Sequence, residues 1–267
     1  MDLFVLRFKL FDMQQAIKTV ALVGAGNVAS HLGEHLRNAG IEIRSCWSRD
    51  VENARLLAKQ LGSVVLDDLH QLPLVDLVLL CVSDDAIASV LQNIPSEFNI
   101  AYTSGSVELS SLPSREKLGV FYPLQTFTKG KRMDLSMVPI LIESTNETWG
   151  NELHALARKV SSQVHFTSSD QRKLIHVGAV MVNNFTNHLA FLAQQFFESK
   201  QLDFDLLKPL LTETIQKLHT MSPFDAQTGP ARRGDFSILD QHKKMLGDKT
   251  SVIYEVMSNS ILETYKK

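Results

Sequence analysis

The feature that most constrains the fold is a β-rich segment that breaks into a glycine turn and continues as a helix. Residues 19–23 read Thr-Val-Ala-Leu-Val, and Gly24, Gly26 and Ala29 follow with Gly-x-Gly-x-x-Ala spacing. Apolar residues then recur at helical spacing until Gly40, and a second β-rich segment, 41–47, follows with almost no loop. Gly24 permits a tight turn, Gly26 a close approach to the backbone, and Ala29 close packing of the helix. This order predicts a βαβ unit that binds the pyrophosphate of a dinucleotide at the helix N-terminus. A glycine turn that serves packing alone is the alternative.

The end of the second strand predicts which dinucleotide is bound. An NAD site commonly places Asp or Glu about 20 residues beyond the glycines, where the carboxylate binds the ribose hydroxyls. This chain has Ser48 and Arg49 there, and a hydroxyl with a guanidinium suits a 2′-phosphate that a carboxylate would repel. NADP (NADPH) is therefore the predicted cofactor. The alternative is that Arg49 is a surface charge and that Asp50 turns back to the ribose.

Further strands are expected to bring more residues to the same edge of the sheet. The apolar run 76–82 is typical of a central parallel strand, and Ser83 and Asp84 after it either line the cofactor site or only cap the next helix. We expect about eight strands in residues 18–167, which form a doubly wound α/β Rossmann domain. The predicted cofactor-binding residues are Gly24, Ala25, Gly26, Asn27, Val28, Ser48, Arg49, Val82, Ser83, Asp84, Ser104 and Gly105.

Composition limits the classes of function. The chain has 267 residues, a hydrophobic content of 44% and a net charge of −2, which suffices for one large core or two moderate ones. Its scattered Lys and Arg residues argue against nucleic-acid binding, and its apolar runs are shorter than a membrane span. The two cysteines, Cys46 and Cys81, lie in predicted strands. They indicate buried thiols rather than a disulfide or metal site, and a reducing, cytoplasmic compartment.

A change of pattern at about residue 168 divides the chain, because only helical patterns follow it, at 170–199, 203–218, 236–246 and 251–266. We expect an N-terminal extension over 1–15, an NADP-binding Rossmann domain over 16–167 and a helical domain for substrate binding and dimerisation over 168–267. The extension is interpreted as poorly ordered or as the product of an upstream start, with Met13 as the alternative start. The turn-rich stretch 221–235 is expected to be a binding loop.

Residues 170–199 predict one uninterrupted helix roughly 45 Å long. At about 100° per residue, His176, Asn183 and Asn187 lie within about 20° of one direction, with Asn184 about 80° away. Polar groups on an otherwise apolar helix need hydrogen-bond partners, and a carbonyl substrate would supply them. His176, Asn183 and Asn184 are therefore the predicted catalytic residues. A satisfied set of core polar residues, or a subunit interface, is the alternative.

Five segments together resemble a known family. They are Gly-Ala-Gly-Asn-Val-Ala at 24–29, Tyr-Thr-Ser-Gly-Ser at 102–106, Tyr-Pro-Leu-Gln-Thr-Phe at 122–127, 176–185 with Asn-Asn-Phe, and Thr-Gly-Pro-Ala-Arg-Arg-Gly-Asp at 228–235. They resemble a bacterial family of Rossmann-like NADP oxidoreductases with a helical C-terminal domain, whose substrates are largely unassigned. More distantly the chain is similar to pyrroline-5-carboxylate reductase, prephenate dehydrogenase and 6-phosphogluconate dehydrogenase. Those relatives imply hydride transfer and a homodimer built through the C-terminal helices.

Two positions depart from these relatives. The hydroxyacid dehydrogenases carry Lys-x-x-x-Asn on the long helix, whereas here Val180 stands four residues before Asn184, and many relatives have His where this chain has Tyr122. We expect an enzyme that transfers a hydride between NADPH and a small carbonyl or imine substrate that bears a carboxylate, with His176 as proton donor and the asparagines near the developing oxyanion. The predicted substrate-binding residues are Tyr122, Gln125, Arg232 and Arg233, of which either arginine could instead be a surface residue. The alternatives are an NADP-binding sensor without catalysis and an NAD-dependent enzyme like prephenate dehydrogenase.

Overall fold

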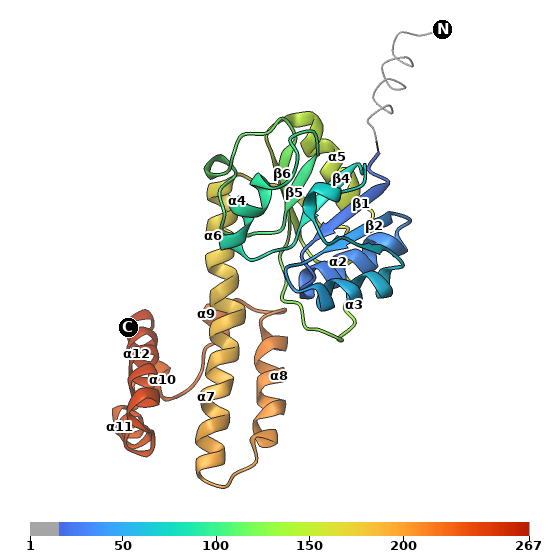
Figure 1. Cartoon of the computed structure of the whole chain (residues 1–267). Coiled ribbons are helices and arrows are strands. Elements are labelled where there is room, and N and C mark those ends of the chain that lie inside the picture. Colours follow the sequence, from blue (N-terminus) through green and yellow to red (C-terminus); the bar gives the residue numbers. More distant parts are fainter. Residues whose placement is uncertain (1–15, 267) are drawn as a thin grey trace. The chain divides into compact units, whose positions relative to one another are not determined.

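The computed structural model of the protein describes residues 16–266. The predicted N-terminal extension therefore lies outside the described residues. The chain forms two compact units, unit 1 up to Met181 and unit 2 from Val182 onward (Figure 1). Strands occur up to Phe166 and helices alone from Ser169 onward, as the sequence pattern indicates. The division into functional domains at 167/168 stays a prediction, because the compact units separate farther along the chain.

Unit 1 is built on a single eight-stranded sheet in the order β3-β2-β1-β4-β5-β6-β7-β8. Its strands are β1 (Thr19–Val23), β2 (Glu42–Trp47), β3 (Val64–Val65), β4 (Leu77–Leu80), β5 (Ile100–Tyr102), β6 (Leu118–Pro123), β7 (Ile140–Ser144) and β8 (Val164–Phe166). Strands β1 to β6 pair in parallel, β7 is antiparallel to β6, and β8 is parallel to β7. The predicted Rossmann fold is confirmed. The strand order reverses between β1 and β4, and ligands of such sheets bind outside the carboxyl ends at that point.

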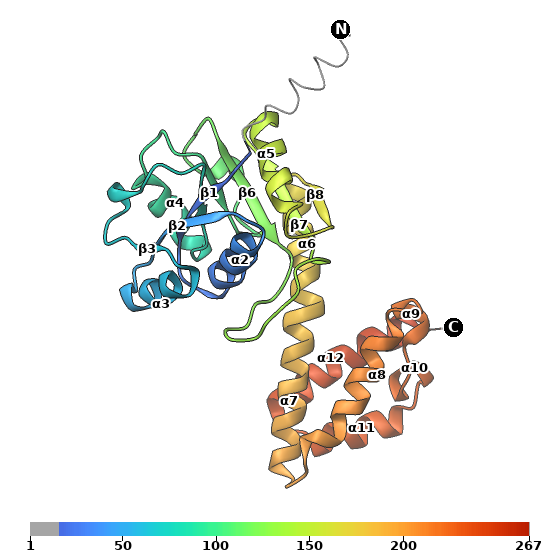
Figure 2. The same ribbon diagram turned by 90° about the vertical axis from the view of Figure 1, so that its right-hand side faces the viewer.

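Helices cover both faces of this sheet (Figure 2). They are α2 (Asn27–Asn38), α3 (Val51–Leu61), α4 (Asp84–Gln92) and α5 (Glu147–Ala157). Unit 1 also contains α6 (Ser169–Ala179) and the 3₁₀ turns η1 (Leu69–Gln71) and η2 (Leu109–Ser111). Alternate residues of β1 enter two separate apolar clusters, Val20 and Leu22 with α2, α3 and α5, and Ala21 and Val23 with α4. Burial on both faces explains why β1 and β4 are continuously apolar.

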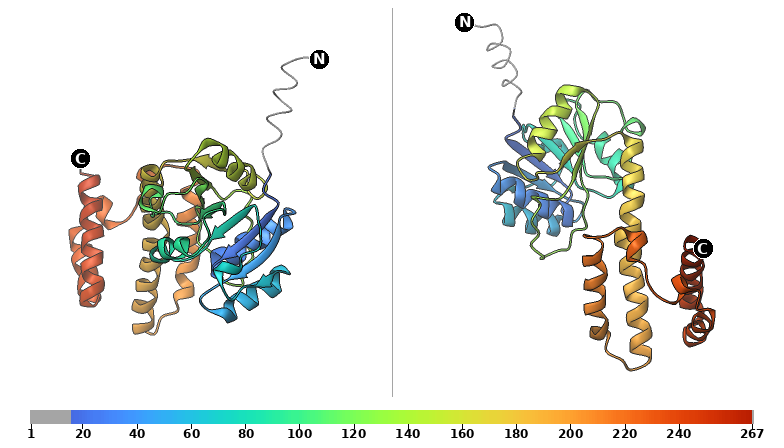
Figure 3. Two further views of the ribbon diagram at one scale, coloured as in Figure 1. Left: turned by 45° about the horizontal axis from the view of Figure 1, so that its top comes forward. Right: turned by 180° about the vertical axis from the view of Figure 1, so that it is seen from behind.

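Unit 2 is entirely helical. It holds α7 (Thr186–Ser199), η4 (Phe204–Leu207), α8 (Lys208–Lys217), α9 (Pro223–Ala226), α10 (Pro230–Arg233), α11 (Phe236–Met245) and α12 (Asp248–Thr264). Helices α7 and α8 run side by side (Figure 3), and α10 packs against α11 and α12. In the described part of the chain, no helix is both long and apolar enough to cross a membrane.

The helical part differs from two predictions in detail. The predicted long helix is present without a break over 169–199, but it consists of α6, a π-helical segment η3 (Val180–Phe185) and α7. Hydrophobic periodicity does not distinguish α from π hydrogen bonding, and β-branched residues such as Val180 and Val182 favour the α-helix only weakly. The turn-rich stretch 221–235 is also not a plain loop, because Pro223 and Pro230 each start one helical turn, α9 and α10.

Candidate active site

The turn after β1 is wedged between neighbouring strand ends. Gly24 has φ +111°, and its N–H donates to the carbonyl of Trp47 at the end of β2 over 2.7 Å. A Cβ built on Gly24 would clash with the carbonyl group of Cys81 just beyond β4, at 2.6 Å from the carbonyl carbon. Both the backbone angle and the lack of space therefore require glycine here.

The next glycine has the opposite surroundings. Gly26 is the N-cap of α2 with φ −82°. Among residues 16–266, no side chain caps this helix, and a Cβ on Gly26 would meet no atom within 4 Å. The first N–H groups of α2 have no intrahelical acceptor and carry the positive end of the helix dipole. Of its neighbours, Asn27 donates from Nδ2 to the carbonyl of Phe127 over 2.9 Å, while Ala25 and Val28 pack on the core. The open backbone at Gly26 fits a pyrophosphate group.

Two charged residues that follow β2, Arg49 and Asp50, differ in their contacts. Asp50 caps α3, accepting from the N–H groups of Glu52 and Asn53 at 3.1 and 3.2 Å, and its own N–H donates to Ser48 Oγ over 3.2 Å. Arg44 and Arg55 pair with glutamates, whereas the exposed Arg49 forms no ion pair within residues 16–266. The residues present here fit a 2′-phosphate better than a ribose diol, because the nearby carboxylate is occupied.

The loops after β4 and β5 are joined by a hydrogen bond from Ser106 Oγ to the carboxylate of Asp84. Ser83, at the N-cap position of α4, makes no capping bond through its side chain. The buried Ser104 accepts at Oγ from the N–H groups of Ser106 and Val107, at 3.1 and 3.0 Å. Ser104 thus builds the turn that presents Gly105. Ser83 and Asp84 are exposed and Val82 is half-buried, so these three remain accessible to a ligand.

Two predicted residues meet directly above Gly105. Tyr122, near the carboxyl end of β6, places its Oη 3.1 Å from Nδ1 of His176 on α6, with the rings edge to face at 65°. A Cβ on Gly105 would lie 2.7 Å from His176 Nδ1 and 2.7 Å from Tyr122 Cζ. Burial raises the pKa of Tyr122, and the nearby Asp84 carboxylate raises it further. The tyrosine therefore remains a neutral phenol.

Within unit 1, helix α6 is anchored to the sheet by a buried arginine, Arg172, which the sequence did not reveal. Arg172 has no exposed surface and binds the carboxylate of Glu143 on β7 and the carbonyl of Val107. Ser169 Oγ also donates to Glu143, at 2.8 Å. Only a capping box between Ser168 and Gln171 is visible in the sequence, and it signals a helix start but no partner. Because His176 lies one turn beyond Arg172, this anchor fixes the imidazole beside Tyr122.

The other predicted site residues lie elsewhere. Asn183 and Asn184 are exposed in unit 2, and Asn183 donates to its neighbour over 3.4 Å. They lie in η3, so the uniform angle that placed them on one face with His176 does not apply to them. Gln125 is exposed, and its side chain accepts from the N–H of Thr126 over 2.8 Å.

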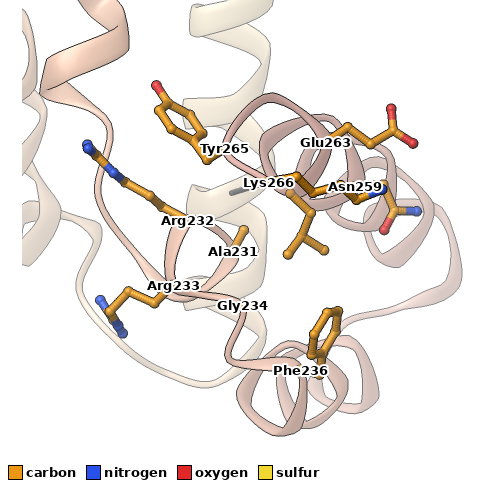
Figure 4. Close-up of a pocket in the computed structure, with 10 residues that line it drawn as sticks. Ala231, Arg232, Arg233, Gly234, Phe236, Asn259, Glu263, Tyr265 and Lys266 are labelled. Atoms are coloured by element: carbon orange, nitrogen blue, oxygen red, sulfur yellow. The ribbon is translucent and has the colours of Figure 1, made fainter.

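Arg232 and Arg233 border a hollow within unit 2 that is lined by α10 and α12 (Figure 4). Arg232 stacks 4.9 Å above the Tyr265 ring and donates to the carbonyls of Asp225 and Gln227. Arg233 pairs with Asp235 at 2.8 Å. In Figure 4 both arginines extend away from the side where Asn259 and Glu263 lie. Their contacts stabilise the α9–α10 segment and leave the substrate role a prediction.

The fold and the glycine turn define a dinucleotide-binding protein of the Rossmann class, and comparison with known proteins specifies the family. Residues 19–100 match the family described as "NADP oxidoreductase coenzyme F420-dependent", and residues 138–261 match "Domain of unknown function (DUF2520)". The chain is 35% identical to the Bacteroides fragilis protein BF3122, a "putative NADP oxidoreductase", with 94% of this chain and 99% of that chain covered and a TM-score of 0.86. The chain belongs to this family of NADP oxidoreductases, which combine a Rossmann domain with a DUF2520 domain.

Two more distant structures share the fold alone. A reductive aminase from Aspergillus terreus, in complex with NADPH and ethyl-5-oxohexanoate, is 12% identical, with 93% of this chain and 94% of that chain covered and a TM-score of 0.69. The 1-pyrroline-5-carboxylate reductase of Streptococcus pyogenes is 13% identical, with 92% and 98% covered and a TM-score of 0.62. A search of curated proteins gave no match. The predicted family and the distant likeness to pyrroline-5-carboxylate reductase are thereby confirmed.

Proposed function

We propose that this NADP oxidoreductase transfers a hydride between NADPH and the carbonyl or imine carbon of a small substrate that also bears a carboxylate. The observation that carries the proposal is that one sheet edge holds both the open glycine turn at Gly26 and the Tyr122–His176 pair. The reductive aminase and 1-pyrroline-5-carboxylate reductase, named for imine chemistry, share this fold, which supports the substrate class.

The cofactor would be held by the chain as follows. The open backbone at Gly26 and the first turn of α2 bind the pyrophosphate. Arg49, which forms no ion pair with the residues that the structure describes, binds the 2′-phosphate with help from Ser48. Val82, Ser83, Asp84 and Gly105 border the region beyond the pyrophosphate, at the ends of β4 and β5. When bound, NADPH supplies the hydride.

The protein's own part in the reaction is to orient the acceptor and to supply a proton. His176 donates a hydrogen bond or a proton to the substrate heteroatom, because imidazole carries out both near neutral pH. Asn183 and Asn184 stay predicted catalytic residues. The predicted substrate-binding residues Gln125, Arg232 and Arg233 likewise stay predictions. Each can be tested by substitution once a substrate is known.

The test is calorimetric titration of NADPH and NADH into the wild-type protein, Arg49→Ala and Arg55→Ala. We expect tighter binding of NADPH than of NADH, and a loss in Arg49→Ala of about 1.5–3 kcal/mol, or roughly 10- to 150-fold, for NADPH alone. Arg55, paired with Glu52 on the exposed face of α3, is the matched control and should change neither affinity. Equal binding of the two cofactors would refute the phosphate site and favour the NAD-dependent alternative. Tight NADPH binding without turnover across carbonyl and imine acids would favour the sensor alternative.

We also propose that a second copy of this chain covers the helices of unit 2. Helices α7 and α8 contain no buried residue, and large apolar side chains such as Leu210, Ile215 and Val256 are 63%, 49% and 62% exposed. Exposed apolar surface of this extent is typical of a protein–protein interface. Burial of this apolar surface of unit 2 would therefore favour the predicted homodimer.

A further inference from the structure

In the Tyr122–His176 pair, the tyrosine hydroxyl contacts one nitrogen of the imidazole ring and not the other. Tyr122 Oη has Nδ1 of His176 as its sole hydrogen-bond partner within residues 16–266. The other ring nitrogen of His176, Nε2, has no partner in that same range. The pair thus divides the imidazole into an edge that contacts the protein and an edge open to a ligand.

The direction of the hydrogen bond follows from the phenol. Burial and the Asp84 carboxylate raise the pKa of Tyr122, so its O–H proton is present at neutral pH and needs an acceptor. A half-buried donor without an acceptor costs about 1–3 kcal/mol, and Nδ1 is the acceptor within reach. The neutral ring then carries its proton on Nε2, since one nitrogen of a neutral imidazole accepts while the other donates.

We propose that Tyr122 is a positioning residue that fixes the ring and tautomer of His176, so that Nε2–H is the group that meets the substrate heteroatom. This inference rests on the proposed function and adds which atom acts. The pattern matches a general rule of acid–base sites, in which a third group orients the imidazole through its other nitrogen.

A phenol suits this task in both states of the ring. It donates to Nδ1 while the imidazole is neutral, and its oxygen accepts from Nδ1–H once the ring is protonated. In the reduction, the protonated ring gives its Nε2 proton to the substrate oxygen or nitrogen as the hydride reaches carbon, which leaves the neutral ring with its proton on Nδ1, donated to the phenol oxygen. A solvent proton then restores the ring. A carboxylate in place of Tyr122 would stabilise the protonated ring alone.

Two neighbours hold this geometry. Arg172, bonded to Glu143 and the Val107 carbonyl, fixes α6 one turn before His176. Gly105 leaves room for the pair, because a Cβ there would lie 2.7 Å from Nδ1 and 2.7 Å from the tyrosine ring. Alanine at Gly105 should therefore separate the two side chains without removing either.

The test is ¹⁵N NMR of the histidine side chains in the full chain without cofactor, with His176 assigned by the signal lost in His176→Gln. In the wild type, we expect the neutral His176 ring to show a protonated Nε2 and an acceptor Nδ1. In Tyr122→Phe and in Gly105→Ala, we expect the two nitrogens to shift toward each other as both tautomers become populated. Tyr254→Phe is the matched control, because its hydroxyl lies 2.8 Å from Nδ1 of His242 in unit 2, and it should leave the His176 signals unchanged.

The outcomes separate this inference from the proposed function. A wild-type ring protonated at Nδ1, or signals identical in Tyr122→Phe, would overturn the positioning role even if NADPH binds as proposed. Conversely, the tautomer could be as expected while NADPH fails to bind, which would refute the function alone. Once a substrate is found, Tyr122→Phe should lower kcat with little change in KM and should alter the pH profile of kcat.

Discussion

Gly24 and Gly26 should respond oppositely to alanine, although they lie two residues apart in the same turn. At Gly24 the positive φ of +111° costs a non-glycine residue about 1–3 kcal/mol. The Cβ must also displace the Cys81 carbonyl group, and overpacking of this kind costs a further ~1–3 kcal/mol. The sum of about 2–6 kcal/mol is a large part of the roughly 5–15 kcal/mol that stabilises a domain. We expect Gly24→Ala to unfold at markedly lower urea concentration or to fail to fold.

Gly26→Ala should fold normally and bind the cofactor poorly. Its φ of −82° suits alanine, and its Cβ meets no atom within 4 Å, so stability should change by about 0.5 kcal/mol or less. The added methyl occupies the space through which a pyrophosphate approaches, and we expect NADPH affinity to fall at least about tenfold, or ~1.4 kcal/mol.

The assays are urea unfolding for stability and calorimetry for NADPH affinity, performed on both variants. Gly247→Ala is the matched control, because Gly247 is also a helix N-cap with negative φ, at −71°, and open space around its Cβ. It should leave NADPH binding unchanged. Equal destabilisation of Gly24→Ala and Gly26→Ala would refute the argument that only Gly24 requires glycine for folding. Wild-type NADPH affinity in Gly26→Ala would refute the proposed pyrophosphate site at Gly26.

Three further predictions concern stability and assembly. Arg172→Met leaves the Glu143 carboxylate without its buried partner and should cost about 3–5 kcal/mol in urea unfolding; adding Glu143→Gln should restore part of this loss, and no restoration would argue against the ion pair as the cause. Burial tends to raise the pKa of Asp76, but hydrogen bonds from the start of β1 outweigh it and lower the pKa. Its contribution is therefore present above about pH 4, the ordinary value, and is lost as pH falls through the lower folded pKa; Asp76→Asn should flatten the stability profile in that acidic window. Leu210→Glu on α8 should convert a dimer to monomers in sedimentation, whereas Leu74→Glu, at a more exposed leucine of unit 1 (81% against 63% for Leu210), should not; an unchanged mass for both would contradict an interface on α8.

Local signals in the sequence predict most of the strands and helices of unit 1. The apolar runs, the glycine turn and the Asp50 cap each depend on residues within one or two elements, and the structure confirms the eight strands and their helices. The regular helical spacing after residue 168 likewise predicted helices. It did not predict η3, because a change from α to π hydrogen bonding leaves the hydrophobic pattern almost unaltered.

The candidate site likewise has one part that local sequence predicts and another that depends on tertiary contacts. The sequence alone predicts the Gly24–Gly26 turn and Arg49 as its cation, because the backbone conformation and charge that a dinucleotide requires are set by neighbouring residues. Only the tertiary structure brought Tyr122 to His176 over 54 positions of sequence and paired Arg172 with Glu143 across 29. Such contacts depend on strand order and on where α6 meets the sheet. Residue type and spacing contain no information on either, so the folded chain alone decides that Nδ1 of His176 is the ring nitrogen that faces Tyr122.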